Sequence, residues 1–404
     1  MKNYSKSFKA LWIGEIVSEL GGAAGGIVNG LLLYELTGSK EWMGILWLIY
    51  FIPSLILQCI SSPFLNYMVK ERLLRNIQLI RSFAYLLPLL GFILVSENGA
   101  IIGLFILQCL LGLMQPIYAS LSFSLLPELC EEKELVNANA LLDGTLRLMS
   151  FLAPGAASLF LLFIPFHFIY VFSAIMFLIS FLSLKRLADN PKQAVSPWTK
   201  RFWWKEMKEG YKIFFQYPGL FRLTLLSSTV QFAVGVTMVL SVPFIRGSLD
   251  GEYWEYAIFS AAFPVGYVIG TWILTSLPKS PLFMYIGLMG GGLSFILLFF
   301  THSIPYAWLC ELSGGILFPL FNAHSAAMFQ KGVAKERLAQ LSSVRLFFLR
   351  LTMPLGILFA SSPFWDLGVR PVFLIIGTII FVPGFFYFLI TLKNTGSTSF
   401  IQVK

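Results

Sequence analysis

The stretch LWIGEIVSELGGAAGGIVNGLLL, residues Leu11–Leu33, is long and apolar enough to cross a bilayer as a helix, which takes ~20 residues. Steps of three and four residues along it connect polar and small residues: Glu15, Glu19, Gly22, Gly26 and Asn29. Such steps keep side chains on one face of an α-helix. Because a carboxylate at the bilayer centre costs at least ~2.5 kcal/mol, we expect this stripe to line a water-filled path.

A second interpretation of this stretch is close helix packing. Glycines at positions 21, 22, 25 and 26 would let two helices touch. Glu15 lies about one turn inside the expected cytoplasmic end and would then reach the headgroups. For Glu19 we favour the cavity, and for Glu15 both interpretations stay open.

The composition excludes a soluble protein. Hydrophobic residues make up 57% of the 404 residues and charged residues only 12%, which is typical of a polytopic membrane protein. The four cysteines form no CxxC pair and no His/Cys cluster, so neither a disulfide framework nor a metal site is indicated. Lysines precede the first apolar run as in a signal peptide, but the run is too long, and we interpret it as an uncleaved first span.

Apolar runs of spanning length recur along the chain and predict an all-α fold with twelve transmembrane helices. We place them at Leu11–Leu33, Met43–Leu65, Ile77–Val95, Ala100–Leu125, Ala140–Phe163, Phe166–Leu184, Leu220–Ile245, Tyr256–Leu277, Leu282–Phe300, Ile304–Phe329, Leu341–Phe359 and Val372–Leu392.

Basic residues give the orientation. With the N-terminus in the cytoplasm, 22 of the 29 Lys and Arg residues fall in or next to the cytoplasmic segments. Three fall on the other side (Lys40, Arg246 and Arg370), and four lie within spans (Arg81, Arg147, Arg345 and Arg350). The net charge of +9 is therefore a topology signal and does not indicate nucleic-acid binding. Both termini are expected to be cytoplasmic.

The chain is expected to divide into two pseudo-symmetric six-helix halves, residues 1–184 and 220–404. Both PELCEEKELVNANALLDGTLRLMSFLAPG and QKGVAKERLAQLSSVRLFFLRLTMPLG run from a charged turn through LRL to a Pro–Gly region, about half the chain apart. Internal repeats of this kind are typical of transporters with the substrate site between the halves.

The central loop, residues 185–219, mixes Lys with Trp203, Trp204 and Phe214, which indicates an amphipathic helix on the inner membrane surface, with a plain linker as the alternative.

Several segments resemble the major facilitator superfamily, and within it the drug-exporter branch that includes macrolide efflux proteins and siderophore exporters. They are YELTGS at Tyr34–Ser39, LLPELC with LVNANAL at Leu125–Leu141, FLAPGAAS at Phe151–Ser158 and EGYKIFFQYPGLFRLTLL at Glu209–Leu226. Each is weak alone, but their order and spacing follow the branch over most of the chain. The resemblance implies a secondary transporter with a cavity between its first, fourth, seventh and tenth helices.

The chain departs from the family pattern in two places. The family's latch of the inner gate, a Gly…Asp-Arg…Arg pattern, is replaced by SSPFLNYMVKERLLR, with Asn66 at the Asp position and Tyr67 at the Arg position. Lysine and arginine at positions 70, 72 and 75 remain to contact helix ends. The fourth span has Gln108 and Gln115 but no Arg, so any proton coupling uses other residues.

Ionisable residues inside other spans are further site candidates. Asn139, Asp143 and Arg147 share one face of the fifth span. Either Asp143 and Arg147 compensate each other, or Arg147 pairs with a carboxylate of the first span; the sequence leaves both open. Arg81 and Arg345 are expected near the membrane surface, and His324 to be a packed, hydrogen-bonded side chain. Arg350 and Glu311, whose stripe contains Gly315 and Asn322, are expected to face the cavity.

These observations favour a proton-coupled secondary transporter of the bacterial cytoplasmic membrane that exports an amphipathic organic compound such as a drug, an antibiotic or a siderophore-like metabolite. Proton-coupling candidates are Glu19, Glu15, Asp143 and Glu311, with Arg147 and Arg350 as charge partners, and the cavity candidates are Asn29, Gln108, Gln115, Gln231 and Asn322. We expect a monomer whose partners are the substrate, protons and the bilayer, without cofactor. A solute importer or lipid carrier of the same fold is the alternative.

A different class of function, a non-transporting sensor or a membrane enzyme, is disfavoured. A sensor would be expected to carry an added soluble domain, and none is visible. Phosphate loops, serine elbows and zinc-ligand pairs are absent from the sequence, and the three histidines are scattered, so an enzyme would have little to work with.

Overall fold

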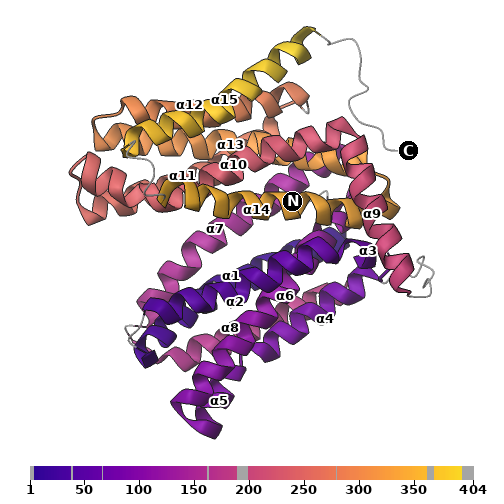
Figure 1. Cartoon of the computed structure of the whole chain (residues 1–404), viewed down its shortest axis with the longest axis vertical. Helices are drawn as coiled ribbons and strands as arrows, with labels where there is room; N and C mark the ends of the chain where they lie inside the picture. The colour runs from indigo at the N-terminus through magenta and orange to yellow at the C-terminus, as the bar shows by residue number, and fades with distance from the viewer. Residues whose placement is uncertain are drawn as a thin grey trace. The chain divides into compact units, whose positions relative to one another are not determined.

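The described chain is helical throughout. The computed structural model describes residues 4–37, 40–65, 67–161, 163–188, 199–278, 280–361 and 368–393. Its elements in order (Figure 1) are α1 (Lys6–Thr37), α2 (Lys40–Ile60), α3 (Ser62–Leu65), α4 (Lys70–Ala84), α5 (Leu87–Val95), α6 (Glu97–Leu129), η1 (Glu132–Glu134), α7 (Leu135–Phe160), α8 (Phe166–Leu184), α9 (Lys200–Gln216), α10 (Pro218–Val242), η2 (Pro243–Ser248), α11 (Tyr253–Ser276), α12 (Pro281–Phe300), α13 (Ile304–Gly332), α14 (Lys335–Ser361) and α15 (Val369–Lys393).

The helices account for the expected membrane spans. Within the described residues, ten helical segments are long and apolar enough to cross a membrane, counting α4 with α5 and α10 with η2 as one each. The apolar part of α2, Ile45–Ile60, is shorter, and α7 is more polar because it carries Asp143 and Arg147. With these two, the all-α architecture of twelve transmembrane helices is confirmed.

Prolines explain two differences between expected and observed spans. The second span was expected to reach Leu65, but α2 ends at Ile60, because Pro63 has no N–H to continue the helical hydrogen bonds. The helix of the third span begins at Lys70, earlier than expected. It breaks between α4 and α5 just before Pro88, because Pro88 also has no N–H to continue the helical hydrogen bonds.

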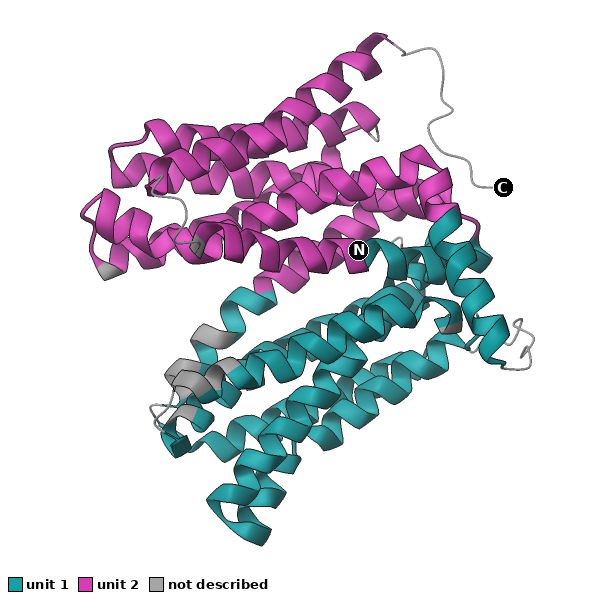
Figure 2. Cartoon of the chain, in the orientation of Figure 1, with its two compact units in different colours: residues 1–130, 149–212, 335–346 teal, residues 131–148, 213–334, 347–404 magenta. Residues whose placement is uncertain are grey.

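The helices form two compact units, which we describe separately (Figure 2). Unit 1 contains residues 1–130, 149–212 and 335–346, and unit 2 contains residues 131–148, 213–334 and 347–404. The boundary therefore cuts α7 and α14: the first part of α7 packs in unit 2, and the first part of α14 packs in unit 1. The sequence repeat identified above covers these same two helix starts.

Serine hydroxyls join α8 to α1 in unit 1. Ser173, Ser180 and Ser183 of α8 donate to backbone carbonyls of α1, at Gly21, Gly14 and Ala10 respectively, each at 2.8 Å. In an apolar surrounding such bonds satisfy each hydroxyl and hold the two helices in register. The helices α1 and α8 are thus held together as a pair in unit 1.

In unit 2, α12 packs between α13 and α15, and α11 packs on α13. The backbones of α12 and α15 approach closely at Gly292 and Gly377, where a Cβ on Gly292 would lie 2.9 Å from the Gly377 carbonyl oxygen. Only glycine on both helices permits this approach of the two backbones.

The central-loop helix α9 packs partly on the protein. The Trp203 indole donates to the Ile60 carbonyl at 3.2 Å, and Gln340 of α14 donates to the Glu206 carbonyl at 2.8 Å. Trp204 and Phe215 are exposed, whereas Phe214 is fully buried and stacks on Phe348 in unit 2. Phe214 therefore belongs to the protein core and does not face the membrane.

The segment around the start of α4 has a charged contact at Lys70. Asn66 lies outside the described residues. The Tyr67 ring packs edge-on against Phe202 of α9, and burial together with nearby Glu206 raises the pKa of Tyr67. Lys70 contacts the end of α6, as expected, through an ion pair with Glu128 at 2.7 Å.

Candidate functional site

The stripe on α1 contains one bonded and one free carboxylate. The Ser122 hydroxyl of α6 donates to Glu15, which is buried. Glu19, one turn further on, is half-buried and makes no hydrogen bond or ion pair with the described residues. The helix α1 begins at Lys6, five residues before the expected span, and Glu15 lies ~14 Å along it. The depth of Glu15 in the membrane stays a prediction.

The glycines of α1 divide between packing and open space. A Cβ at Gly21 would meet Met176, and one at Gly25 would meet Tyr85 and Ser173. A Cβ at Gly26 would meet no atom within 4 Å. Helix packing therefore explains Gly21 and Gly25, while Gly26 lies on an open face together with Glu19. Asn29, at the far end of the stripe, is buried and donates to Gln108 of α6 at 3.5 Å.

A polar cluster surrounds Glu15 in unit 1. Arg81 of α4 donates to Gln115 at 2.6 Å, and its guanidinium carbon lies 4.9 Å from the centre of the Tyr118 ring. Arg81 is 5% exposed and lies eleven residues into α4, which begins at Lys70. Its expected place near the membrane surface stays a prediction. We call Glu15, Arg81, Gln115, Tyr118 and Ser122 the unit 1 cluster.

A second polar cluster lies in unit 2, between α7, α11 and α13. Arg147 Nε lies 3.2 Å from Asp143 Oδ1, so the two side chains compensate each other, which is one of the two interpretations left open above. Tyr267 of α11 donates to the other oxygen of Asp143, and Asn322 donates to the Tyr267 hydroxyl at 2.8 Å. The Arg147 guanidinium lies over the Tyr267 ring at 4.5 Å. These four residues are the unit 2 cluster.

The two clusters share their chemistry although their helices differ. Each combines a carboxylate, an arginine stacked on a tyrosine, and a side-chain amide. A cation over an aromatic face contributes ~0.5–2 kcal/mol, and buried charges are tolerated when each is paired or hydrogen-bonded. Both clusters therefore stabilise charge inside a membrane-spanning unit.

The remaining candidates differ in their surroundings. Glu311 of α13 is half-buried and makes no hydrogen bond or ion pair with the described residues, like Glu19. Gln231 and Arg350 are also half-buried. Gly315, on the Glu311 stripe, packs against the backbone of α11 at Gly266 and not on a cavity. Arg345, expected at the membrane surface, is buried with its guanidinium over Phe123 at 5.5 Å.

Sequence reasoning missed three members of the clusters. Tyr118 and Ser122 follow Gln115 at steps of three and four residues, so helical spacing was sufficient to find them. Helical spacing could not have identified Tyr267, because its neighbours along α11 are apolar or small. His324 was expected to be packed and hydrogen-bonded, and its Nδ1 lies 2.8 Å from the Leu320 carbonyl oxygen.

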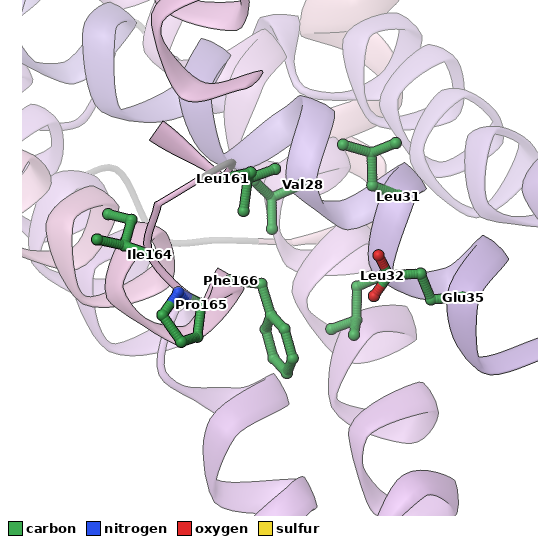
Figure 3. Close-up of a pocket in the computed structure, with 8 residues that line it drawn as sticks. All are labelled: Val28, Leu31, Leu32, Glu35, Leu161, Ile164, Pro165 and Phe166. Carbon is green, nitrogen blue, oxygen red and sulfur yellow. The ribbon is translucent and has the colours of Figure 1, made fainter. Parts of the chain in front are cut away.

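Unit 1 also has a small pocket near the end of α1 (Figure 3). Its volume is 240 Å³, and Figure 3 shows an apolar lining that includes Val28, Leu32 and Phe166, with Glu35 as its one acidic side chain. No group of three His, Cys, Asp or Glu side chains that could hold a metal occurs in the described part of the chain.

The sequence matches the model of the Major Facilitator Superfamily over residues 11–357. The chain belongs to this superfamily. It is a multi-pass secondary transporter, since the family and its fold are those of transporters and not of enzymes.

Relatives and solved structures agree with this membership. The uncharacterized MFS-type transporter YvqJ of Bacillus subtilis (strain 168) is 20% identical over 363 residues, 87% of this chain and 85% of that protein. Macrolide efflux protein A of Streptococcus pyogenes is 26% identical over 187 residues, 44% of this chain and 45% of that protein. The outward-facing crystal structure of a bacterial homologue of the iron transporter ferroportin has a TM-score of 0.74 at 15% identity, covering 97% of this chain and 100% of that chain.

Proposed function

We propose that this transporter exports an amphipathic organic compound, of the drug or antibiotic class, in exchange for protons by alternating access. It acts as a monomer in the bacterial cytoplasmic membrane with both termini in the cytoplasm. The similarity to macrolide efflux protein A supports export, and the asymmetry of basic residues supports the orientation.

The observation that carries the proposal is the contrast between bonded and free carboxylates. Glu15 and Asp143 are held by hydroxyl donors, whereas Glu19 and Glu311 bind no described side chain. An ionised carboxylate in the membrane costs at least ~2.5 kcal/mol, so a free one gains most from taking up a proton. Glu19 in unit 1 and Glu311 in unit 2 are therefore the proton-carrying groups.

The clusters have a different role in this mechanism. Glu15 is held by the Ser122 hydroxyl, and Asp143 is paired with Arg147, so neither carboxylate exchanges protons during each cycle. Gln231, Asn322 and Arg350 supply polar contacts to the substrate in unit 2, and the open face around Gly26 supplies room in unit 1. An amphipathic compound fits such a mixture of apolar and polar groups.

Reconstituted vesicles test the proposal. Purified protein is inserted into liposomes, a pH gradient of either sign is imposed, and uptake of a radiolabelled macrolide is followed together with internal pH. We expect macrolide movement against its gradient only when protons flow in the opposite direction. Macrolide and protons moving in the same direction would identify an importer, and macrolide flux that ignores the gradient would exclude proton coupling.

A further inference from the structure

A long groove follows the contact between α10 and α15 in unit 2. Its volume is 1040 Å³, at the upper end of the ~300–1,000 Å³ of small-molecule sites. Its lining includes Leu225, Val382 and Phe386, which are 53%, 55% and 58% exposed. In a helix that spans a membrane, exposed apolar side chains of this kind contact lipid. The groove therefore opens to the bilayer.

The length of the groove matches one leaflet. It extends along α10 from Pro218 to Thr229, and eleven residues at 1.5 Å each measure ~16 Å. Half of the ~30 Å hydrocarbon core is ~15 Å. A single acyl chain that enters from one side of the membrane would run the whole length of the groove.

One end of the groove is basic. Arg222 lies in the first turns of α10, half-buried, with its guanidinium carbon 4.9 Å from the centre of the Tyr387 ring near the end of α15. Stacking on Tyr387 holds the guanidinium of Arg222, which is part of the groove lining. Lys393, which ends α15, adds charge at the same end of that helix. A guanidinium binds phosphate oxygens in a bidentate manner.

We propose that this groove binds an anionic phospholipid, with its phosphate on Arg222 and one acyl chain along Leu225, Val382 and Phe386. Zwitterionic lipids have the same chains but bring a cation close to Arg222, so the site discriminates by headgroup. Basic pockets between membrane helices bind anionic headgroups for this reason. Placement in the inner leaflet rests on the proposed orientation, whereas the headgroup preference depends neither on orientation nor on transport.

Native mass spectrometry of the purified protein tests the site. The protein is titrated with phosphatidylglycerol and with phosphatidylcholine of identical acyl chains. We expect phosphatidylglycerol to bind about fivefold more tightly, which corresponds to the ~1 kcal/mol that one basic residue contributes near an anionic headgroup. Arg222→Gln removes this preference, and Arg222→Lys retains it.

Two further variants separate this site from general surface effects. Lys212→Gln removes an exposed charge of α9 outside the groove and leaves the preference unchanged. Val382→Trp fills the groove on its exposed side, so it weakens the binding of both lipids and does so even if Arg222→Gln fails to fold. The proposal is overturned if Lys212→Gln acts like Arg222→Gln, if Val382→Trp leaves lipid binding unchanged, or if a macrolide displaces phosphatidylglycerol from the groove.

Discussion

Asp143 accepts a hydrogen bond from Tyr267 while its other oxygen is paired with Arg147, so one tyrosine joins α7 to α11 within unit 2. The same hydroxyl accepts from Asn322 at 2.8 Å, which extends the connection to α13. Three helices are thus held by one fully buried side chain. This makes Tyr267 the structural centre of the unit 2 cluster.

Removing the hydroxyl of Tyr267 should destabilise the protein. In Tyr267→Phe the amide of Asn322 and one oxygen of Asp143 both lose a partner, and a buried polar group without its partner costs ~1–3 kcal/mol. We expect a lower thermal unfolding midpoint in detergent than for wild type. Tyr306→Phe is the matched control, because Tyr306 is 66% exposed and should lose nothing. Equal midpoints for both variants would show that the cluster does not stabilise the unit.

An uncharged contact holds the first part of α14 in unit 1. Gln58 of α2 is fully buried, and its Nε2 donates to the Ser343 carbonyl at 3.0 Å and to the Ser343 hydroxyl at 2.8 Å. The Ser343 hydroxyl donates in return to the Gln58 carbonyl at 3.0 Å. This chain therefore has an amide–hydroxyl contact near the loop where the family carries its charged latch.

Gln58→Leu should weaken this contact more than Ser343→Ala. Leucine removes the donor to both Ser343 groups, whereas alanine keeps the bond from Gln58 to the backbone carbonyl. We expect a loss of ~1–3 kcal/mol for Gln58→Leu and about half of that for Ser343→Ala. Proteolysis between α13 and α14 in the detergent-purified protein measures the effect, and an identical cleavage rate for all three proteins would contradict it. Because the contact is uncharged, the rate should not change with salt concentration.

The sequence predicted the number and order of spans because apolar length is set by bilayer thickness, and the structure agrees. The ends of the helices were less predictable. The helices α1 and α4 continue beyond their apolar runs to Lys6 and Lys70, because charged residues also adopt helical structure, so apolar length alone does not give the first helical residue. The cross-helix partners were not predictable either, because the contact of Tyr267 with Asp143 depends on how α11 packs on α7.

Two adjacent glycines of α1 provide a matched pair of variants that test how α1 packs in unit 1. Gly25→Ala would bring a methyl group to 2.8 Å from the Ser173 hydroxyl and into the Tyr85 ring, both buried, so we expect a loss of ~1–3 kcal/mol from overpacking. Gly26→Ala meets open space and should be neutral or more stable by up to ~1 kcal/mol, since alanine favours the helix. Thermal unfolding of the two variants side by side checks this. Two equal shifts would mean that α1 packs differently.

The last prediction concerns the free carboxylates. Glu19→Gln imitates the protonated side chain permanently, so the protein should still bind substrate but lose accumulation driven by a pH gradient. Exchange of labelled for unlabelled macrolide across the liposome membrane should survive, because exchange needs no net proton movement. Glu311→Gln should behave alike if each unit carries a proton, whereas a defect in one variant alone would assign coupling to that unit.

Two other variants test whether Glu19 carries the proton because its carboxylate has no hydrogen-bond partner among the described residues. Glu35→Gln changes an exposed acid on the same helix as Glu19 and should transport like wild type. Glu15→Gln keeps an oxygen that can accept from Ser122, so its main effect should be on stability, through the loss of a negative charge near Arg81. If Glu15→Gln abolishes coupling while Glu19→Gln transports at the wild-type rate with proton movement intact, the bonded carboxylate is the carrier. The division of roles between the two acids of α1 would then be reversed.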